Sequence, residues 1–238
     1  MFKNTPENID QALDWYFQLK REHPSLFVQR ALRRLVLDQK ELRAFAVENG
    51  TALGVTFSNP YVIVVVDLVE SRTVDGRTIR YPYFRTIARK QLDGGFNVVI
   101  IATIADAALG RPGDIVLVEQ ERHATGRTEL ELPRGFAEAG LNAAENACKE
   151  LTEETGFVGL EVTLLGKTLV DSGQTDNMVH FLHIPVIAKN AAAPEAHEAI
   201  SGIRLMSRAE LWSAFGSGLI RDGFTLQAIG LLDKLNRP

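Results

Sequence analysis

The sequence predicts an α/β protein, in which a mixed sheet lies between layers of helices as an α/β/α sandwich, preceded by a helical N-terminal extension. Over roughly the first fifty of the 238 residues, apolar side chains recur at the three- and four-residue steps of amphipathic helices. From about residue 61 the period becomes that of strands. Strands then precede one short helix, further strands follow it and helices close the chain, which is the element order of a layered α/β domain. We therefore expect an extension over residues 1–55 and a larger domain over residues 56–238.

The extension is predicted to contain two helices. Thr5 and Pro6 form a favourable helix start, because the hydroxyl caps the first turn and the proline has no N–H to leave unpaired. After Pro24, a second helix is predicted over residues 25–48. Its arginines, at positions 30, 33 and 34, are typical of a solvated or salt-bridged helix face, with phosphate binding as the alternative. The sequence leaves open whether this extension serves dimerisation or covers a site.

The larger domain is predicted to begin with a β-hairpin whose strands meet at the Asp75-Gly76 turn. The predicted strands span residues 61–70, 77–88, 96–105, 115–119, 160–170, 178–188 and 203–206. Two closing helices are predicted, one over residues 207–215 that begins with a serine cap, and one over residues 224–235.

The one helix between these strands is predicted from its ends. Asn142 followed three residues later by Glu145 is a capping box, in which each side chain accepts a hydrogen bond from the other residue's backbone. Gly156 supplies a left-handed residue at the other end. This helix is therefore expected to span roughly residues 143–155.

Three acids lie close together on that helix, at positions 150, 153 and 154. At this spacing like charges repel each other by a few tenths of a kcal/mol per pair, so local stability disfavours Glu150, Glu153 and Glu154 together. We expect a cation among them, and Mg²⁺ prefers such oxygen ligands. The alternative is a solvated acidic helix face with no ligand.

Composition excludes some classes of partner. A net charge of −4 and a pI near 5.8 argue against nucleic acid and anionic membranes, which require a basic surface. No run of residues is long and apolar enough for a membrane span, and the first 25 residues lack the apolar segment of a secretory signal. The single cysteine, Cys148, fits a reducing compartment. We therefore expect a cytoplasmic protein.

The acidic helix and the loop before it resemble the signature of the Nudix hydrolases, G-x5-E-x7-R-E-U-x-E-E-x-G-U, where U is a bulky apolar residue. Its nine defined positions are occupied here by Gly135, Leu141, Lys149, Glu150, Leu151, Glu153, Glu154, Gly156 and Phe157. All match except Leu141 and Lys149, which replace a Glu and an Arg. The resemblance implies a Nudix-type α/β/α sandwich, with Mg²⁺ or Mn²⁺ held by Glu150, Glu153, Glu154 and the carbonyl oxygen of Arg134.

The two departures affect chemistry more than fold. Lys149 keeps a positive charge but lacks the planar fork with which an arginine holds a carboxylate, so Glu150 is oriented less firmly. Leu141 stands where the family has a glutamate that supports the metal, and a leucine cannot bind or orient a cation. Either Glu138 compensates, or the protein has lost turnover.

A second stretch resembles the members that hydrolyse ADP-ribose, in which a Gln-x-Arg precedes the loop and Glu-Leu-Pro leads into the signature. Here these residues are Gln120, Arg122 and Glu131-Leu132-Pro133. The resemblance makes Arg122 the first candidate for binding phosphate, with Glu131 beside it as a substrate-binding residue. Arg85 is the second candidate, although a surface arginine is the more common interpretation. Asp176 is a candidate for accepting sugar hydroxyls, with a turn residue as its alternative.

The same relatives use a glutamate on a mobile acidic loop to deprotonate the attacking water. Glu198 is the better candidate for this general base and Glu195 the next, while Glu153 is a third catalytic candidate within the helix. The implied substrate is a nucleoside diphosphate sugar such as ADP-ribose, cleaved to AMP and a sugar phosphate. The resemblance also implies a homodimer. The rival interpretations are a catalytically impaired nucleotide-binding or regulatory module, and a scaffolding protein that uses only the fold.

Overall fold

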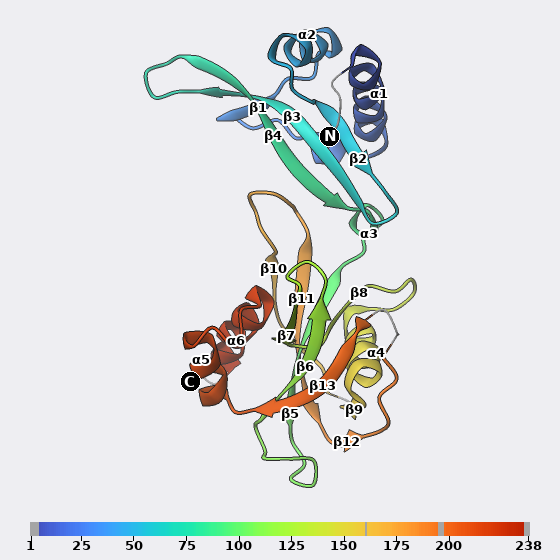
Figure 1. Ribbon diagram of the computed structural model, residues 1–238, viewed down its shortest axis with the longest axis vertical. Helices are drawn as coiled ribbons and strands as arrows, with labels where there is room; N and C mark the ends of the chain where they lie inside the picture. The colour runs from blue at the N-terminus through green and yellow to red at the C-terminus, as the bar shows by residue number, and fades with distance from the viewer. Residues whose placement is uncertain (1–4, 160, 195–197, 236–238) are drawn as a thin grey trace. The chain divides into compact units, whose positions relative to one another are not determined.

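The computed structural model describes residues 5–159, 161–194 and 198–235 of the chain. The chain folds into two compact units (Figure 1). Unit 1 comprises residues 1–94 together with the segment 171–177, and unit 2 comprises residues 95–170 and 178–238. The chain thus passes from one unit to the other at three points.

Unit 1 contains a four-stranded antiparallel sheet with helices packed on it. Its elements are α1 (Pro6–Glu22), the short 3-10 helix η1 (Pro24–Phe27), β1 (Arg33–Leu35), α2 (Gln39–Asn49), β2 (Gly54–Ser58), β3 (Val62–Arg72), β4 (Thr78–Ala88) and α3 (Arg89–Leu92). β3 is the central strand, because β1, β2 and β4 all pair with it. Apolar side chains of α1, α2 and the strands share one core, which includes Leu13, Tyr16, Leu42 and Val65.

The predicted helix over residues 25–48 is wrong in its first half. Within this range, only the end of η1 and α2 are helical, and α2 begins where the Asp38 carboxylate accepts the Glu41 N–H at 2.9 Å. Before it, the Gln29 side chain bonds both backbone groups of Leu35 (2.9 and 3.1 Å), and β1 pairs with β3. These contacts hold the segment extended despite its helical pattern of apolar residues. Its arginines at positions 30, 33 and 34 are exposed, and they do not lie on a helix.

Unit 2 holds most of the remaining elements. They are β5 (Asn97–Ile104), β6 (Ile115–Arg122), β7 (Arg127–Glu131), β8 (Arg134–Phe136), α4 (Ala143–Thr155), β9 (Phe157–Val158), β10 (Thr163–Leu169), β11 (Met178–Val186), β12 (Ala188–Lys189), β13 (Ile200–Met206), α5 (Arg208–Gly216) and α6 (Gly223–Leu235). Its seven-stranded sheet has the order β10-β11-β5-β6-β13, with β7 paired to β6 and β8 to β5. β11 and β5 run parallel and the other pairs are antiparallel, so the sheet is mixed.

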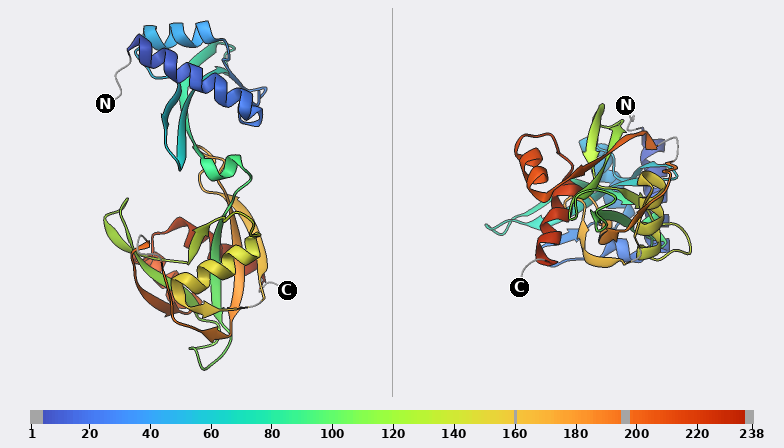
Figure 2. Two further views of the ribbon diagram at one scale, coloured as in Figure 1. Left: turned by 90° about the vertical axis from the view of Figure 1, so that its right-hand side faces the viewer. Right: turned by 90° about the horizontal axis from the view of Figure 1, so that it is seen from below.

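Side chains of β5 alternate between two cores, one on each face of this sheet. Val98 and Ile100 pack with Ala147 and Leu151 of α4. Val99 and its alternating partners pack on the other face with residues of α5 and α6. Figure 2 shows α4 crossing the near face of the sheet in its left-hand view. The predicted α/β/α sandwich with a mixed sheet, preceded by a helical N-terminal segment, is confirmed.

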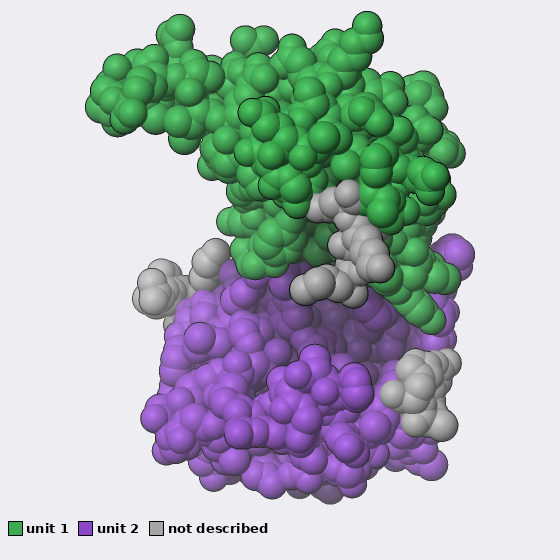
Figure 3. Space-filling view, turned by 45° about the horizontal axis from the view of Figure 1, so that its top comes forward, with its two compact units in different colours: residues 1–94, 171–177 green, residues 95–170, 178–238 purple. Residues whose placement is uncertain are grey.

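The compact units divide at a different place from the predicted domains (units coloured separately in Figure 3). The sequence placed the boundary between residues 55 and 56, whereas the units separate between residues 94 and 95. The difference arises because β3 and β4 lie with β1 and β2 in a sheet of their own and do not join the larger sheet. None of the described helices has the length and apolar composition needed to cross a bilayer.

Candidate metal and active site

Helix α4 starts and ends where its sequence predicts. The Asn142 side chain accepts hydrogen bonds from the N–H groups of Ala144 and Glu145, and the Glu145 carboxylate accepts the Asn142 N–H at 2.8 Å. Gly156 ends the helix with φ of +73°, a conformation that glycine adopts without strain. Both ends of the acidic helix are therefore fixed by local chemistry.

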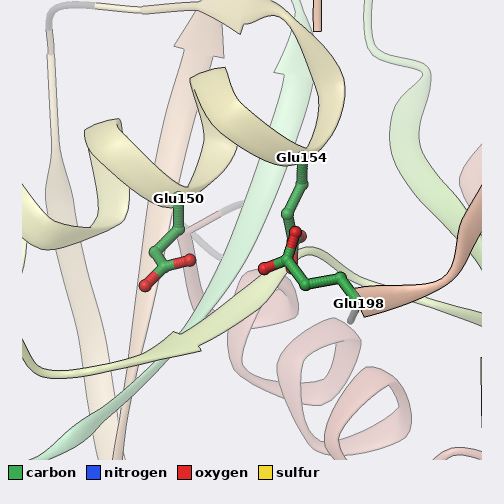
Figure 4. Close-up of side chains that lie close together, drawn as sticks. All are labelled: Glu150, Glu154 and Glu198. Carbon is green, nitrogen blue, oxygen red and sulfur yellow. The ribbon is translucent and has the colours of Figure 1, made fainter. Parts of the chain in front are cut away.

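Three carboxylates gather beside α4 (Figure 4). Glu150 and Glu154 hang from the same side of the helix, one turn apart, and Glu198 reaches them from the segment that precedes β13. One ligand oxygen of each residue lies within 4.8 Å of the others. Gly135 of β8 makes room for this group, because a Cβ there would overlap the Glu150 carboxyl group.

Burial changes the acidity of two of these groups. Burial, together with the neighbouring charge of Glu198, raises the pKa of Glu150 to about 7 and that of Glu154 to about 8. The N–H of Arg134 donates to Glu154 Oε2 at 3.2 Å and acts in the opposite direction. Glu150 and Glu154 are therefore hard to ionise by themselves. A positive charge placed among the three carboxylates would stabilise their ionised forms.

The residue types and spacing fit a hard divalent cation. Mg²⁺ binds oxygen ligands at about 2.1 Å, so ligands on opposite sides of one ion lie roughly 4 Å apart. The three carboxylates are close to that spacing already. Glu150, Glu154 and Glu198 are therefore the residues best placed to surround a cation in the described part of the chain.

Hydrogen bonds from β6 fix the backbone at Glu198 and Ala199. The Gln120 side chain on β6 donates to the Glu198 carbonyl oxygen at 2.6 Å, and the N–H of Glu121 donates to Ala199 O at 3.1 Å. Ala199 adopts a φ of +51°, which is unfavourable for a residue with a Cβ. Strained backbone conformations of this kind cluster at active sites and ligand-binding sites. Glu195, the other candidate base, lies outside the described residues.

Glu153 is not one of the three clustered carboxylates and pairs instead with Lys149. Lys149 bonds Glu153 at 2.7 Å and Glu138 at 2.8 Å, and these two acids raise the pKa of the lysine. Lys149 thus joins the helix to the preceding loop. No described hydrogen bond or ion pair joins it to Glu150.

A network of charged groups lies on the other side of Glu154. Arg122 forms a forked ion pair with Glu131, with its shortest distance at 2.6 Å, and Arg134 Nη2 reaches the same carboxylate at 2.7 Å. Glu131 is only 3% exposed. The guanidinium of Arg134 also stacks on Phe224 (4.9 Å to the ring centre) and lies 3.5 Å from Asp222. Because the Arg134 N–H binds Glu154, this network is joined directly to the clustered acids.

Two predicted substrate-binding residues belong to unit 1. Arg85 on β4 forms an ion pair with Asp67 at 2.7 Å. Asp176 is exposed within the segment 171–177. Unit 2 by itself brings together Glu150, Glu154, Glu198, Glu131, Arg122 and Arg134. The proposed roles of Arg85 and Asp176 stay predictions.

Sequence reasoning missed several residues of this site. The guanidinium of Arg134 and the carboxylate of Asp222 were not considered, because their meeting depends on how the start of α6 contacts the segment between β7 and β8, where the Leu132 N–H donates to Thr225 Oγ1 at 3.1 Å. Asn146 was assigned only to the polar face of the helix, yet it is completely buried. Its position one turn before Glu150 on that face was the available signal.

Comparison with known proteins places this geometry in context. A family model described as the NUDIX domain matches residues 97–223. A putative nudix hydrolase 2 of Caenorhabditis elegans is 45% identical over 64 residues, which are 26% of this chain and 29% of that protein. An ADP-ribose pyrophosphatase of Bacillus subtilis (strain 168) is 34% identical over 77 residues, which are 32% of this chain and 42% of that protein. The chain thus matches less than half the length of these curated relatives.

A solved structure extends the likeness to most of the fold. The crystal structure of an ADP compounds hydrolase superposes with a TM-score of 0.59 at 17% sequence identity, covering 76% of this chain and 89% of that chain. At this identity the likeness concerns the fold alone.

Proposed function

Since this chain belongs to the Nudix family, we propose that it is a Mg²⁺-dependent pyrophosphohydrolase that cleaves the diphosphate of a nucleoside diphosphate linked to another moiety. The proposed substrate is ADP-ribose or a related nucleotide sugar, cleaved to AMP and a sugar phosphate. The observation that carries the proposal is the group of Glu150, Glu154 and Glu198 oxygens within 4.8 Å of one another. The relative described as an ADP-ribose pyrophosphatase, which is 34% identical over 77 residues, supports the substrate class.

Glu150 and Glu154 are the proposed ligands of Mg²⁺, or of Mn²⁺ in its place, because they project side by side from α4. The bound ion would offset the charge of the diphosphate and activate a water molecule. The Glu153 carboxylate and the carbonyl oxygen of Arg134 stay predicted additional ligands.

Glu198 is the proposed general base that takes the proton of the attacking water, since its carboxylate lies beside both proposed ligands and its backbone is held by Gln120. Glu195 and Glu153 stay alternative candidates. Arg122 and Arg134 both hold their guanidinium groups on Glu131, and the charge of Arg122 acts on Glu154, so these arginines would attract the diphosphate to the acid cluster. Glu131 holds both arginines and is too buried to be readily reached by substrate.

The experiment is a Mg²⁺-dependent assay of the purified protein on a panel of nucleoside diphosphate sugars. We expect ADP-ribose to be cleaved, and Glu154→Gln to lose at least a hundredfold in kcat/KM because a ligand carboxylate is removed. Glu161→Gln, which changes an exposed acid outside the cluster, is the matched control and should retain full rate. Product release no greater than that of Glu154→Gln across the panel would contradict the proposal.

The rival proposal of a nucleotide-binding module predicts a different result. Lys149 bonds Glu138 and Glu153, so the Glu150 side chain lacks the arginine partner implied by the family signature. Tight nucleotide binding without turnover, with turnover appearing in Leu141→Glu, would favour that module over an enzyme.

The proposal also includes a cytoplasmic homodimer with no nucleic-acid partner. It rests on the single cysteine, the acidic net charge and the resemblance. Sedimentation of the full chain across a range of concentrations would test the dimer, and a monomer throughout would contradict it.

A further inference from the structure

At two positions of the family signature, this chain has residues that do not help to orient the clustered acids. Leu141 has no polar group, and Lys149 is occupied by Glu138 and Glu153. Yet the oxygens of Glu150 and Glu154 still converge with that of Glu198. Some other contact must set the position of α4 against the backbone beside it.

Asn146 makes such a contact. It lies one turn before Glu150 and is 0% exposed. Its amide nitrogen donates to the Phe136 carbonyl oxygen at 3.1 Å, and its amide oxygen accepts the Glu138 N–H at 3.1 Å. The side chain therefore pairs with a backbone carbonyl at the end of β8 and with a backbone N–H two residues later.

The segment bonded by Asn146 leads directly into the acid cluster. In β8 the Arg134 N–H donates to Glu154, and the absence of a Cβ at Gly135 leaves space for Glu150. The other side of this segment is fixed to β5 through strand pairing and through the Ala137 N–H, which donates to Phe96 O at 2.8 Å. Asn146 thus adds two hydrogen bonds between α4 and the end of a strand that is also held by β5 and by the bond from Arg134 to Glu154.

The residue type matters for this role. An asparagine inside a helix is less favourable than an alanine, and a buried amide is costly unless its groups are paired. An apolar residue could fill the same space, but its packing has no direction, so it would not fix the register of helix and strand. A paired amide in this position specifies that register.

We propose that Asn146 is a positioning residue that sets the register of α4 against β8, and thereby the spacing of Glu150 and Glu154 for a divalent cation. This inference rests on the proposed function of the acid cluster. Asn146 does not touch the cation or the substrate and acts through the backbone of residues 134–138.

The test is the affinity of the full chain for Mn²⁺ alone, measured by titration calorimetry at one fixed pH. Asn146→Ala should raise the dissociation constant about tenfold, as expected when a group that orients metal ligands is removed. Asn146→Asp is nearly isosteric and keeps the acceptor for Glu138 N–H but loses the donor to Phe136 O, so it tests the same role if the alanine variant fails to fold. It should weaken Mn²⁺ binding in the same direction.

Two controls separate positioning from general destabilisation. Asp114→Ala removes a buried carboxylate that pairs with Arg111 before the start of β6, at the end of the strand remote from Arg122, and should leave the Mn²⁺ affinity unchanged. Glu154→Gln should weaken it strongly. Hydrogen exchange of the Glu138 N–H should also become faster in Asn146→Ala, because that group loses its acceptor.

The outcomes distinguish this inference from the proposed function. Equal Mn²⁺ affinity in the wild type and Asn146→Ala, with Glu154→Gln weakened, overturns the positioning role and leaves the hydrolase standing. A weaker Asn146→Ala, in a protein that hydrolyses nothing in the panel, supports the positioning role and overturns the hydrolase. A wild type that binds no Mn²⁺ overturns both.

Discussion

Asp67 in unit 1 and Glu131 in unit 2 are both buried carboxylates that hold an arginine. Arg85 bonds Asp67 at 2.7 Å and Arg122 bonds Glu131 at 2.6 Å, and each carboxylate is 3% exposed. The sequence ranked both arginines as phosphate-binding candidates. The two ion pairs are therefore nearly the same in length and in the burial of the carboxylate.

Their further partners differ. The second partner of Asp67 is the Tyr16 hydroxyl, at 2.7 Å, and Tyr16 lies in the core of unit 1. The second partner of Glu131 is Arg134, whose N–H binds Glu154 in the acid cluster. The comparison teaches that two similar buried ion pairs are distinguished by the other partner of the carboxylate, which is a core tyrosine for Asp67 and an arginine bonded to the acid cluster for Glu131.

The largest expected effect is on stability, at Asp67. Asp67→Asn should lower the free energy of unfolding by roughly 3–5 kcal/mol, because Arg85 loses its buried partner. Urea denaturation of the full chain would measure this loss. Asp10→Asn, which breaks the exposed pair with Arg43, should cost less than about 1 kcal/mol. Equal losses in the two variants would show that burial does not distinguish these pairs.

Next in size is an effect on activity, at Glu131. Glu131→Gln should lower kcat/KM by about 10- to 100-fold, because Arg122 and Arg134 lose the carboxylate that orients them. Steady-state kinetics on ADP-ribose would measure it. Glu129→Gln is the matched control, since Glu129 lies in the same strand but pairs with Arg221, for which no described bond to the acid cluster exists. A comparable loss in both variants would remove the distinction between the two regions.

A smaller effect is expected at Tyr16. Tyr16→Phe removes the hydroxyl that donates to Asp67 and should destabilise the protein by about 2 kcal/mol, as for other hydrogen bonds to charged groups. Burial and the charge of Asp67 raise the pKa of Tyr16, so the hydroxyl stays protonated and available as a donor. Tyr81→Phe, which loses only a contact with Ser71 at 3.3 Å, should cost less in the same urea experiment. A neutral Tyr16→Phe would show that Arg85 alone satisfies Asp67.

A gradual effect is expected from a dependence of stability on pH that arises in unit 2. The pKa values of Glu150 and Glu154, about 7 and about 8, lie above their usual value of 4.5, so the folded state binds more protons than the unfolded state between these limits. The free energy of unfolding of the metal-free protein should therefore fall as pH rises from about 5 to 8, by at most about 1.4 kcal/mol per pH unit for each group.

Thermal unfolding between pH 5 and 8.5 would measure this slope. Mg²⁺ should reduce it, because a bound cation stabilises the ionised carboxylates. Replacing both Glu150 and Glu154 by glutamine should remove their contribution. A metal-free wild type whose stability rises over this range would contradict the burial of these two acids.

Helix α4 shows which structural features can be predicted from local sequence. Asn142, Glu145 and Gly156 lie at the ends of α4 as predicted, since capping depends on contacts within a few residues. The same reasoning failed over residues 25–48, where Gln29 and the pairing of β1 with β3 override a helical pattern of apolar residues. It also did not anticipate that Lys149 bonds both Glu153 and Glu138, because spacing alone does not select among these acids.

The sequence by itself determined the α/β/α class, the ends of α4 and the presence of Glu150 and Glu154 on one side of it, because periodicity and capping act within a few residues. Only the tertiary structure decided that Glu198 joins the cluster and that Arg85 pairs with Asp67 in unit 1. It also decided that Asn146 bonds the segment after β8. Each of these contacts joins segments that are brought together by the packing of the sheet and its helices, and no local pattern encodes such a meeting.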